Sequence, residues 1–283
     1  MCVVFIIFNL DKDTPLIILT NRDEQYNRKT LPMNWYEFDS NPNKILCAKD
    51  ISSNGSQFAI YPNGKFAVLT VFRESSTTST TSTTSTTSTT STTSTTSTTS
   101  STSSTSSTST PSRGKLTILY NSLTTEEYIK YLIDNRAKYL GFNLIFGTIN
   151  DVYLFSNRDK TNSYVLKKID KNFGIGNGYH DDPWWKVKHG IDLIENISNI
   201  SNTNLLNILL DDILAPLDQV QETGRDKDFE YNLSGICCSK PMVDEKGVFG
   251  TIGSYVHIFK DGYMDTTEYC KNANPNNYIT YLV

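Results

Sequence analysis

The chain has 283 residues, with 26 basic and 30 acidic side chains and a formal net charge of −4. This balance lacks the basic excess that phosphate binding requires, so we expect no nucleic-acid partner, and it does not favour docking on an anionic membrane. No apolar run approaches the roughly 18 residues of a membrane-spanning helix. The sequence therefore predicts a cytoplasmic protein without a transmembrane segment.

The chain begins MCVVFIIFNL, an apolar stretch that could be read as a secretory signal. It has no basic residue ahead of the apolar run and no small-residue cleavage site, and it meets Asp11, Lys12 and Asp13 directly. Residues 2–10 and 15–20 are instead typical of two strands, separated by the turn-forming DKDT. The first twenty residues are thus predicted to form a β-hairpin.

Three further hairpins are indicated along the chain. Turn sequences at 62–64 and 261–262 separate strand-like segments, 55–61 from 65–72 and 255–259 from 263–269. Residues 142–150 and 151–156 form another such pair. Antiparallel pairing is therefore expected to dominate the sheets.

Residues 75–110 consist only of serine and threonine, largely as an STT repeat. Such a tract has no apolar surface to offset the entropy of ordering, so it is predicted to be a disordered low-complexity insertion. A long loop insertion costs little closure entropy, and the favoured organisation is a single domain spanning residues 1–283 with the tract in a loop. The alternative is a linker between two domains.

Three helices are predicted. Thr124 and Glu127 form a capping-box pattern ahead of an apolar face. A second helix is expected to start at Asp181-Asp182-Pro183, with apolar positions continuing to Ile194, and a third covers about 205–214. Helices laid over antiparallel sheets give an α+β layered domain.

The cysteines and histidines give little sign of a metal site. The five cysteines have no C-x-x-C spacing, so free thiols are expected. Cys237 and Cys238 are adjacent and are predicted to point to opposite sides of a strand as packing residues. His180, His189 and His257 show no ligand spacing, so no metal site is predicted.

Cys2 is the first candidate for chemistry. Removal of Met1 would give Cys2 a free α-amino group with a pKa near 8 beside its own thiol. That combination places a nucleophile and its base in one residue. The competing interpretation is a core strand that carries a thiol by accident.

A polar run, LTNRDE at 19–24, follows the second strand. It could be a solvated turn with a local ion pair. If the first two strands pair, however, Arg22 returns beside Cys2, where a guanidinium would lower the thiol pKa and hold a carboxyl or amide group.

The motifs together resemble those of one known family, the NRDE family, which includes the Transport and Golgi organisation 2 homologues. The resemblance covers nearly the whole chain outside the Ser/Thr tract. It is carried, in order, by MCVVFIIF, LTNRDEQY, NGKFAVLT, SRGKL, GFNLIFG, the SNR of residues 156–158, GIGNGYHDDPWWKVKHG and FGTIGSYVHIF.

The resemblance implies the N-terminal-nucleophile hydrolase fold, a four-layer αββα sandwich with antiparallel sheets. Related hydrolases attack amides with an N-terminal cysteine assisted by an arginine, an acidic residue and asparagines. The matching positions here are Cys2, Arg22, Asp23 and Asn177. Because the spacing differs from that of the hydrolases, Glu24 and Asn21 are alternatives for the acidic position.

Two positions depart from the family pattern. Val71 stands where the family has an asparagine aligned with an oxyanion donor, and Ile252 stands where it has an arginine. Loss of one oxyanion donor costs about 10²–10³ in rate. These departures favour ligand binding over efficient amide hydrolysis.

The expected function is therefore that of an intracellular factor in Golgi organisation and protein secretion and in the handling of haem or of lipid and acyl-coenzyme A. It would act by binding a small molecule; no cofactor is required, and haem or acyl-coenzyme A are the implied ligands. Association with the Golgi or mitochondria is part of the same expectation. The alternatives are a Cys2-dependent thiol amidase or acyltransferase acting on a small acyl amide, and a scaffold that recruits partners through the Ser/Thr tract.

Overall fold

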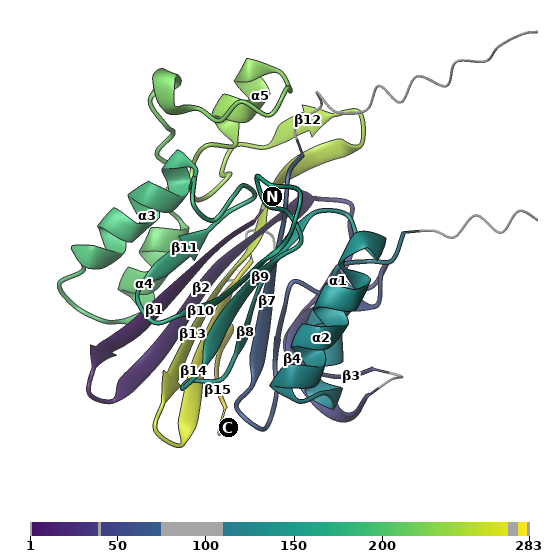
Figure 1. Cartoon of the computed structure of the whole chain (residues 1–283). Helices are drawn as coiled ribbons and strands as arrows, with labels where there is room; N and C mark the ends of the chain where they lie inside the picture. Colours follow the sequence, from purple (N-terminus) through teal and green to yellow (C-terminus); the bar gives the residue numbers. More distant parts are fainter. Residues whose placement is uncertain (1, 39–40, 75–109, 271–276, 282–283) are drawn as a thin grey trace, which may run out of the picture.

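A computed structural model describes residues 2–38, 41–74, 110–270 and 277–281 of the chain. The predicted Ser/Thr insertion, residues 75–110, lies outside the described residues apart from Thr110. Two antiparallel sheets face each other, with helices on the outer side of each sheet (Figure 1).

In the described part of the chain, seven strands form the first sheet, in the order β11-β1-β2-β13-β14-β15 with β12 paired to β13. The strands are β1 (Cys2–Asp11), β2 (Thr14–Gln25), β11 (Phe173–Ile175), β12 (Met242–Asp244), β13 (Gly247–Lys260), β14 (Tyr263–Tyr269) and β15 (Asn277–Tyr281). The predicted N-terminal hairpin thus lies inside this sheet, where β11 and β13 flank it.

The second sheet has the order β10-β9-β8-β7-β6-β4-β3, with β5 paired to β4. Its strands are β3 (Thr30–Phe38), β4 (Asn41–Asp50), β5 (Gly55–Ser56), β6 (Phe58–Ile60), β7 (Phe66–Val71), β8 (Phe142–Gly147), β9 (Val152–Ser156) and β10 (Val165–Ile169). In sequence, β7 is followed by α1, and residues 75–109, which lie outside the described residues, fall between them.

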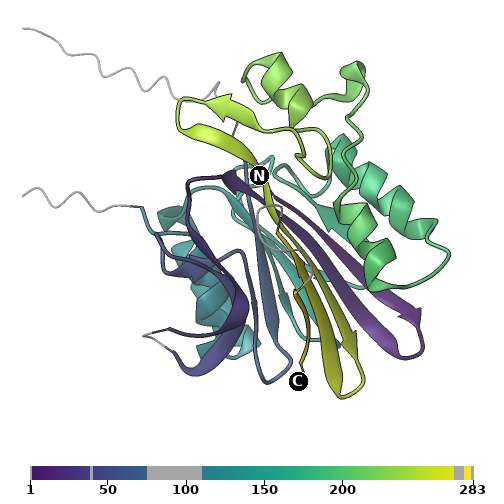
Figure 2. The ribbon, with the colours of Figure 1, turned by 180° about the vertical axis from the view of Figure 1, so that it is seen from behind.

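Helices cover both sheets from outside (Figures 1 and 2). The α-helices are α1 (Gly114–Leu119), α2 (Thr125–Asn135), α3 (Trp185–Glu195), α4 (Asn202–Leu209) and α5 (Lys227–Asn232), and 3₁₀ turns occupy Tyr120–Ser122, Arg136–Lys138 and Leu217–Gln219. The pair α3 and α4 packs on the first sheet, and α1 and α2 pack on the second. The four-layer αββα sandwich with antiparallel sheets is thereby confirmed.

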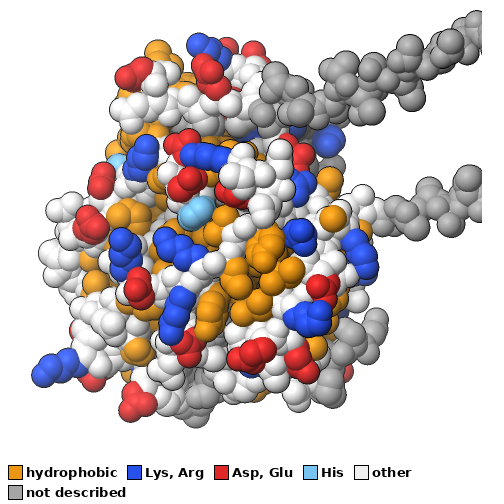
Figure 3. Space-filling model, in the orientation of Figure 1, with side chains coloured by type: hydrophobic (Ala, Val, Ile, Leu, Met, Phe, Trp, Pro, Cys, Tyr) orange, Lys and Arg blue, Asp and Glu red, His pale blue; other side chains and the backbone are white. Residues whose placement is uncertain are grey.

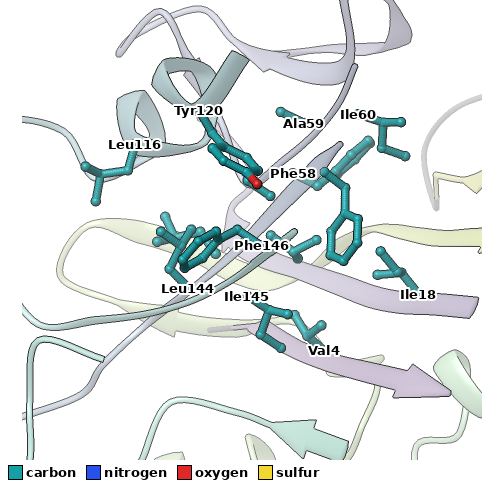
Figure 4. Close-up of a cluster of buried hydrophobic side chains, with 14 of the residues drawn as sticks. Val4, Ile18, Phe58, Ala59, Ile60, Leu116, Tyr120, Leu144, Ile145 and Phe146 are labelled. Atoms are coloured by element: carbon teal, nitrogen blue, oxygen red, sulfur yellow. The ribbon is translucent and has the colours of Figure 1, made fainter. Parts of the chain in front are cut away.

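Strand alternation separates the apolar layers. Val4 and Ile18 of the first sheet point toward Phe58 and Ile145 of the second, and all four are buried (Figure 4). The alternate residues of β1, such as Phe5, pack instead with helices α3 and α4. Near-complete burial on both faces explains why the start of β1 is an unbroken apolar run.

All four predicted hairpins are confirmed. The β1–β2 pair has Phe5 opposite Leu19, β6 pairs with β7, β8 with β9, and β13 with β14, each antiparallel. The predicted strand at 55–61 is divided into β5 and β6, because β5 pairs with the end of β4 whereas β6 also pairs with β7.

The predicted capping box at α2 is confirmed. The Thr124 side chain accepts from the Glu127 backbone N–H at 3.2 Å, and the Glu127 carboxylate accepts from the Thr124 N–H at 2.8 Å. This helix start is therefore fixed by local contacts alone.

The predicted start of the second helix is wrong. Helix α3 begins at Trp185, and Trp184 is its extended N-cap residue without a side-chain cap. The Trp184 indole lies against Gly178, which keeps Trp184 outside the helix, and the Asp181 and Asp182 carboxylates pair with Lys160 at 3.4 and 3.8 Å. Tertiary contacts thus override the local capping signal.

The third helix is shifted toward the N-terminus. Helix α4 spans Asn202–Leu209 because the Ser201 side chain accepts from the Asn204 backbone N–H at 3.1 Å and caps it. At the other end, the Asp211 carbonyl accepts from the Cys237 N–H at 2.8 Å, which holds the chain away from a helical path.

Cys237 and Cys238 are both buried, but the prediction that they lie on a strand is wrong, since they belong to an irregular segment between α5 and β12. None of the five cysteines, all of which lie in the described residues, forms a disulfide.

In the described residues, none of the helices combines the length and apolar character needed to cross a bilayer. On the face shown in Figure 3, described Lys and Arg side chains lie among Asp and Glu side chains rather than in one basic strip.

Candidate functional site

The register of the first hairpin sets the site. Cys2 lies opposite Arg22, so their side chains emerge on the same face of the sheet, the face that looks toward the second sheet. Both residues line a cavity of about 770 Å³ at the end of the sandwich. Cys2 is only 7% exposed, so its sulfur is reached through this cavity rather than from the surface.

Cys2 is held by two backbone-linked contacts. Its N–H donates to Asn177 Oδ1 at 3.2 Å. Burial raises the pKa of the Cys2 thiol above its usual value, while the backbone N–H of Asp23, which can donate to the sulfur, acts in the opposite direction. Because burial is the larger effect, the resting sulfur is a thiol rather than a thiolate at neutral pH.

Asn177 is the predicted site residue that the structure places directly at Cys2. It follows β11, is fully buried, and uses its Nδ2 to donate to the Val71 carbonyl at 2.7 Å. The Asn177 carbonyl in turn accepts from the Arg73 N–H at 2.7 Å. Asn177 therefore ties the end of β7 to the backbone of Cys2.

Arg22 is adjacent to Cys2 in the sheet, as predicted, but its guanidinium is directed elsewhere. Nη2 pairs with Asp50 Oδ2 at 2.8 Å, and Nη1 donates to the Thr30 hydroxyl. The same Asp50 oxygen accepts from Arg28 Nε at 2.6 Å. Burial of Asp50 would raise its pKa, but the hydrogen bonds from Arg28 and Ser53 prevail and lower it below its usual value.

Asp23 points away from Arg22, because successive residues of a strand alternate between faces. Its Oδ1 accepts from the Thr251 hydroxyl at 2.6 Å, and its Oδ2 lies 3.9 Å from Lys186 Nζ and 3.7 Å from Cys238 Sγ. Lys186 and Asp23 have side chains with no exposed surface. The Asp23 carboxylate belongs to a buried charged cluster under α3, and its charge helps to raise the pKa of Cys2, while the Asp23 backbone N–H acts in the opposite direction.

The two alternatives to Asp23 differ in position. The Asn21 side chain donates to the Leu209 and Ile236 carbonyls at 2.7 and 2.9 Å, on the helix side of the sheet, and so joins helix α4 to β2. Glu24 lines the cavity with Cys2 and lies 3.5 Å from Arg28.

The two departures from the family pattern are also separated. Val71 lines the cavity that contains Cys2. Ile252 lies at an irregularity in the pairing of β13 with β2, between Thr251 and Gly253, and is not among the residues that line this cavity. Of the two apolar replacements, Val71 lines the cavity and Ile252 does not.

Sequence reasoning missed several charged residues of the site, among them Asp50, Arg113 and Lys186. Asp50 ends a strand that was not predicted. Lys186 lies among apolar positions of a predicted helix, and a lysine in such a place is a weak sign of a buried charged pair. Arg113 belongs to the SRGKL motif, which the resemblance identified without giving it a role.

Trp184 and Trp185 line a second cavity of about 610 Å³ together with Tyr179, and Arg73 lines both cavities. The Trp185 ring stacks on His189 with 4.5 Å between centroids.

Within the described residues, no group of three or more His, Cys, Asp or Glu side chains is arranged to hold a metal ion.

Comparison with known proteins gives one family. The family model for Transport and Golgi organisation 2 matches residues 1–269. A search of curated proteins found no match.

Among solved structures, the chain is similar to an N-acylethanolamine-hydrolyzing acid amidase ortholog of Caenorhabditis elegans, with 9% identity, a TM-score of 0.43, and coverage of 91% of this chain and 92% of that one. Two variants of the conjugated bile acid hydrolase from Clostridium perfringens show 10% and 9% identity and TM-scores of 0.49 and 0.46. For both, the alignment covers 99% of this chain and 92% of the hydrolase.

Proposed function

Because this chain belongs to the Transport and Golgi organisation 2 family, we propose that it is a factor in Golgi organisation and protein secretion that acts by binding a small organic molecule in the cavity beside Cys2. The proposal includes action in the cytoplasm or at the Golgi or mitochondria. Haem and acyl-coenzyme A are its candidate ligands, and no cofactor is required.

The observation that carries this proposal is the cavity itself. Its volume of about 770 Å³ falls within the range of roughly 300–1,000 Å³ that small-molecule sites occupy. Apolar side chains share its wall with charged ones, as in sites that bind a ligand and fix its orientation. The apolar lining residues include Leu69, Val71, Phe229, Leu233 and Phe249.

The environment of Cys2 favours binding over rapid catalysis. Burial raises the thiol pKa, and the Arg22 guanidinium, which would offset this, is paired with Asp50. Val71 contributes no side-chain donor to the cavity wall. A buried neutral thiol suits contact with a ligand better than fast attack on an amide, because the thiolate is the nucleophile.

The test is native mass spectrometry of the full-length protein purified without added ligand, before and after unfolding. We expect a small molecule that is released on unfolding and whose amount falls when Leu69→Trp fills the cavity. Leu166→Trp is the control, since Leu166 is exposed on β10, away from the cavity. A protein that carries no small molecule and gains no thermal stability from haem or from an acyl-coenzyme A would contradict the proposal.

A second function is favoured by the hydrogen bond between the Cys2 nitrogen and Asn177. If Cys2 is the first residue of the mature protein, this bond holds its α-amine in place as a base. The Cys2 sulfur would attack an acyl amide, forming an S–C bond as the C–N bond breaks, and the thiol proton would pass through the α-amine to the departing amine. Water would then cleave the thioester, releasing the acid and restoring the thiol.

This second function has its own test. Intact mass shows whether Cys2 is the first residue and whether its amine is free, and an acyl-like electrophile at neutral pH should then label Cys2 and not Cys2→Ser. The amidase is excluded if Met1 is retained, if the Cys2 amine is acetylated, or if Cys2→Ser fully rescues a loss-of-function phenotype. None of these results would remove the binding function.

A further inference from the structure

The cavity beside Cys2 has more cationic than anionic side chains in its wall. The cations are Arg22, Arg28, Arg73, Arg113, Arg225 and Lys246, and the anions are Asp23, Glu24 and Asp50. The Asp23 carboxylate already accepts from the Thr251 hydroxyl and lies 3.9 Å from Lys186 Nζ, so it does little to balance this excess.

Several of these cations are already neutralised. Asp50 accepts from Arg22 at 2.8 Å and from Arg28 at 2.6 Å. Arg73 forms a two-pronged pair with Glu230, with Nη1–Oε2 and Nη2–Oε1 distances of 3.0 Å. These guanidiniums serve the fold and are poorly placed to receive a ligand.

Arg113 differs from them. It is half-buried, its Nη1 donates to the Gly141 carbonyl at 2.8 Å, and no carboxylate in the described part of the chain lies within ion-pair distance of it. Burial lowers the pKa of Arg113. Arg113 and Cys2 line the same cavity.

A partly buried guanidinium that pairs with no carboxylate costs folding free energy unless a bound anion pairs with it. Arginine binds carboxylate and phosphate oxygens through paired N–H groups, which Nε and Nη2 of Arg113 supply. Arg225 lines the same cavity at the exposed side, where its guanidinium lies 5.1 Å from the Phe229 ring centre. Phe229 and four other apolar residues complete the wall.

We infer that the cavity binds an amphipathic anion whose carboxylate or phosphate group is held by Arg113, with Arg225 at the rim and the apolar part of the molecule against apolar lining residues such as Leu69, Val71 and Phe249. The inference rests on the proposed ligand-binding function and specifies the class of ligand. Cys2 then lies next to the bound molecule.

The experiment measures how fast iodoacetamide alkylates Cys2 in the full-length protein, read by peptide mass spectrometry, with decanoate, decyl phosphate or uncharged decanamide present. We expect at least one of the two anions to slow alkylation of Cys2 at concentrations where decanamide does not. Protection by decanoate alone identifies a carboxylate ligand, and protection by decyl phosphate alone identifies a phosphate ligand.

Arg113→Gln should lower the affinity for the protecting anion about 10- to 100-fold, the range expected when hydrogen bonds to a charged group are lost. Arg113→Lys keeps the charge but not the paired donors. Its affinity for the anion should therefore lie between those of Arg113→Gln and the unchanged protein. Arg158→Gln is the matched control, because Arg158 pairs with Glu74 and lines the other cavity, and it should bind the anion normally. The melting temperature of each variant without probe verifies folding; should Arg113→Gln not fold, the Arg113→Lys comparison decides.

Three results would overturn the inference. Decanamide could protect Cys2 as well as the anions do, none of the three probes could protect it, or the affinity for the anion could stay normal after replacement of Arg113. None of these results removes the proposed ligand-binding function, which the co-purified molecule tests separately. An uncharged co-purified molecule together with protection by decanamide would retain the binding function and reject the anion site.

Discussion

Cys2 and Arg22 face each other across the β1–β2 hairpin, yet the Arg22 guanidinium bonds to Asp50 of the second sheet and not to the sulfur. The two residues therefore have separate roles. Cys2 presents a thiol to the cavity, and Arg22 ties the two sheets together at the edge of that cavity. We propose instead that the guanidinium of Arg113 binds the anionic group of the ligand.

Asp50→Asn should be strongly destabilising. The change leaves the buried Arg22 without its anion and also removes one of the two carboxylates that pair with Arg28. Breaking a buried ion pair from one side costs about 3–5 kcal/mol, so the free energy of unfolding in urea should fall by an amount of that order. Glu37→Gln is the control, because Glu37 pairs with Lys44 across exposed surface on the neighbouring strands and should lose less than about 1 kcal/mol.

Lys186→Met should destabilise the protein through Asp23. The change leaves a carboxylate with no exposed surface without its nearby ammonium, at an expected cost of about 3–5 kcal/mol. Adding Asp23→Asn should recover part of that loss, which a double-mutant cycle in urea measures. Additive losses would mean that the 3.9 Å pair contributes no coupling.

Asn177→Asp and Asn177→Ala should separate the two bonds of Asn177. Asp keeps an acceptor for the Cys2 N–H but loses the donor to the Val71 carbonyl, whereas Ala loses both. Each buried bond left unmade costs about 1–3 kcal/mol. We expect both variants to be less stable and Cys2 to be alkylated faster in the Ala variant, because only Ala frees the Cys2 backbone; similar alkylation rates would argue against that anchor.

Gly190→Ala should destabilise the protein even though alanine favours helices by about 1 kcal/mol. Gly190 lies in α3, and a Cβ there would come within 2.1 Å of the buried Phe5 ring. Overpacking of this kind typically costs 1–3 kcal/mol. Phe5→Leu in the same protein should relieve the contact, so the double variant should be more stable than the sum of the two single losses; a fully additive result would show that α3 docks on β1 without this restraint.

His257 should make stability fall on acidification. It is fully buried between the sheets, and its Nδ1 bonds to the Thr266 hydroxyl at 2.6 Å. Its ring centroid lies 4.7 Å from that of Phe58 and 6.4 Å from that of Tyr255. Burial lowers its pKa from 6.5 to about 3. The folded state therefore favours the neutral ring, so this contribution is complete above pH 6.5 and is lost by about 1.4 kcal/mol per pH unit as the pH falls from 6.5 toward 3.

The measurement is the free energy of unfolding of the unchanged protein and of His257→Asn at several values between pH 6.5 and 4.5. Burial raises the pKa of Glu268, which acts with the opposite sign in this window, so the difference between the two proteins is the relevant quantity. A difference that stays constant with pH would show that His257 does not titrate as described.

Local sequence was enough for the elements whose signals lie within a few residues. The hairpins at 62–64 and 261–262 are centred on turn residues, with Gly64 and Gly262 at φ of 75° and 74°, and the α2 cap is a contact between neighbours. The start of α3 could not be read in this way, because the Trp184 indole is held by Gly178 and the aspartates before it are held by Lys160.

The sequence alone determined that the chain is antiparallel α+β and that β1 and β2 pair, because apolar periodicity and turn chemistry act over short distances. From that pairing it also placed Arg22 beside Cys2. Only the tertiary structure decided which charges meet. Strand alternation turned Asp23 toward Lys186, sheet packing paired Arg22 with Asp50, and Arg113, the N-cap residue of α1, came to line the cavity. Such pairings join residues far apart in sequence across the two sheets and the helix layer, and no local pattern encodes which of several charges will be buried together.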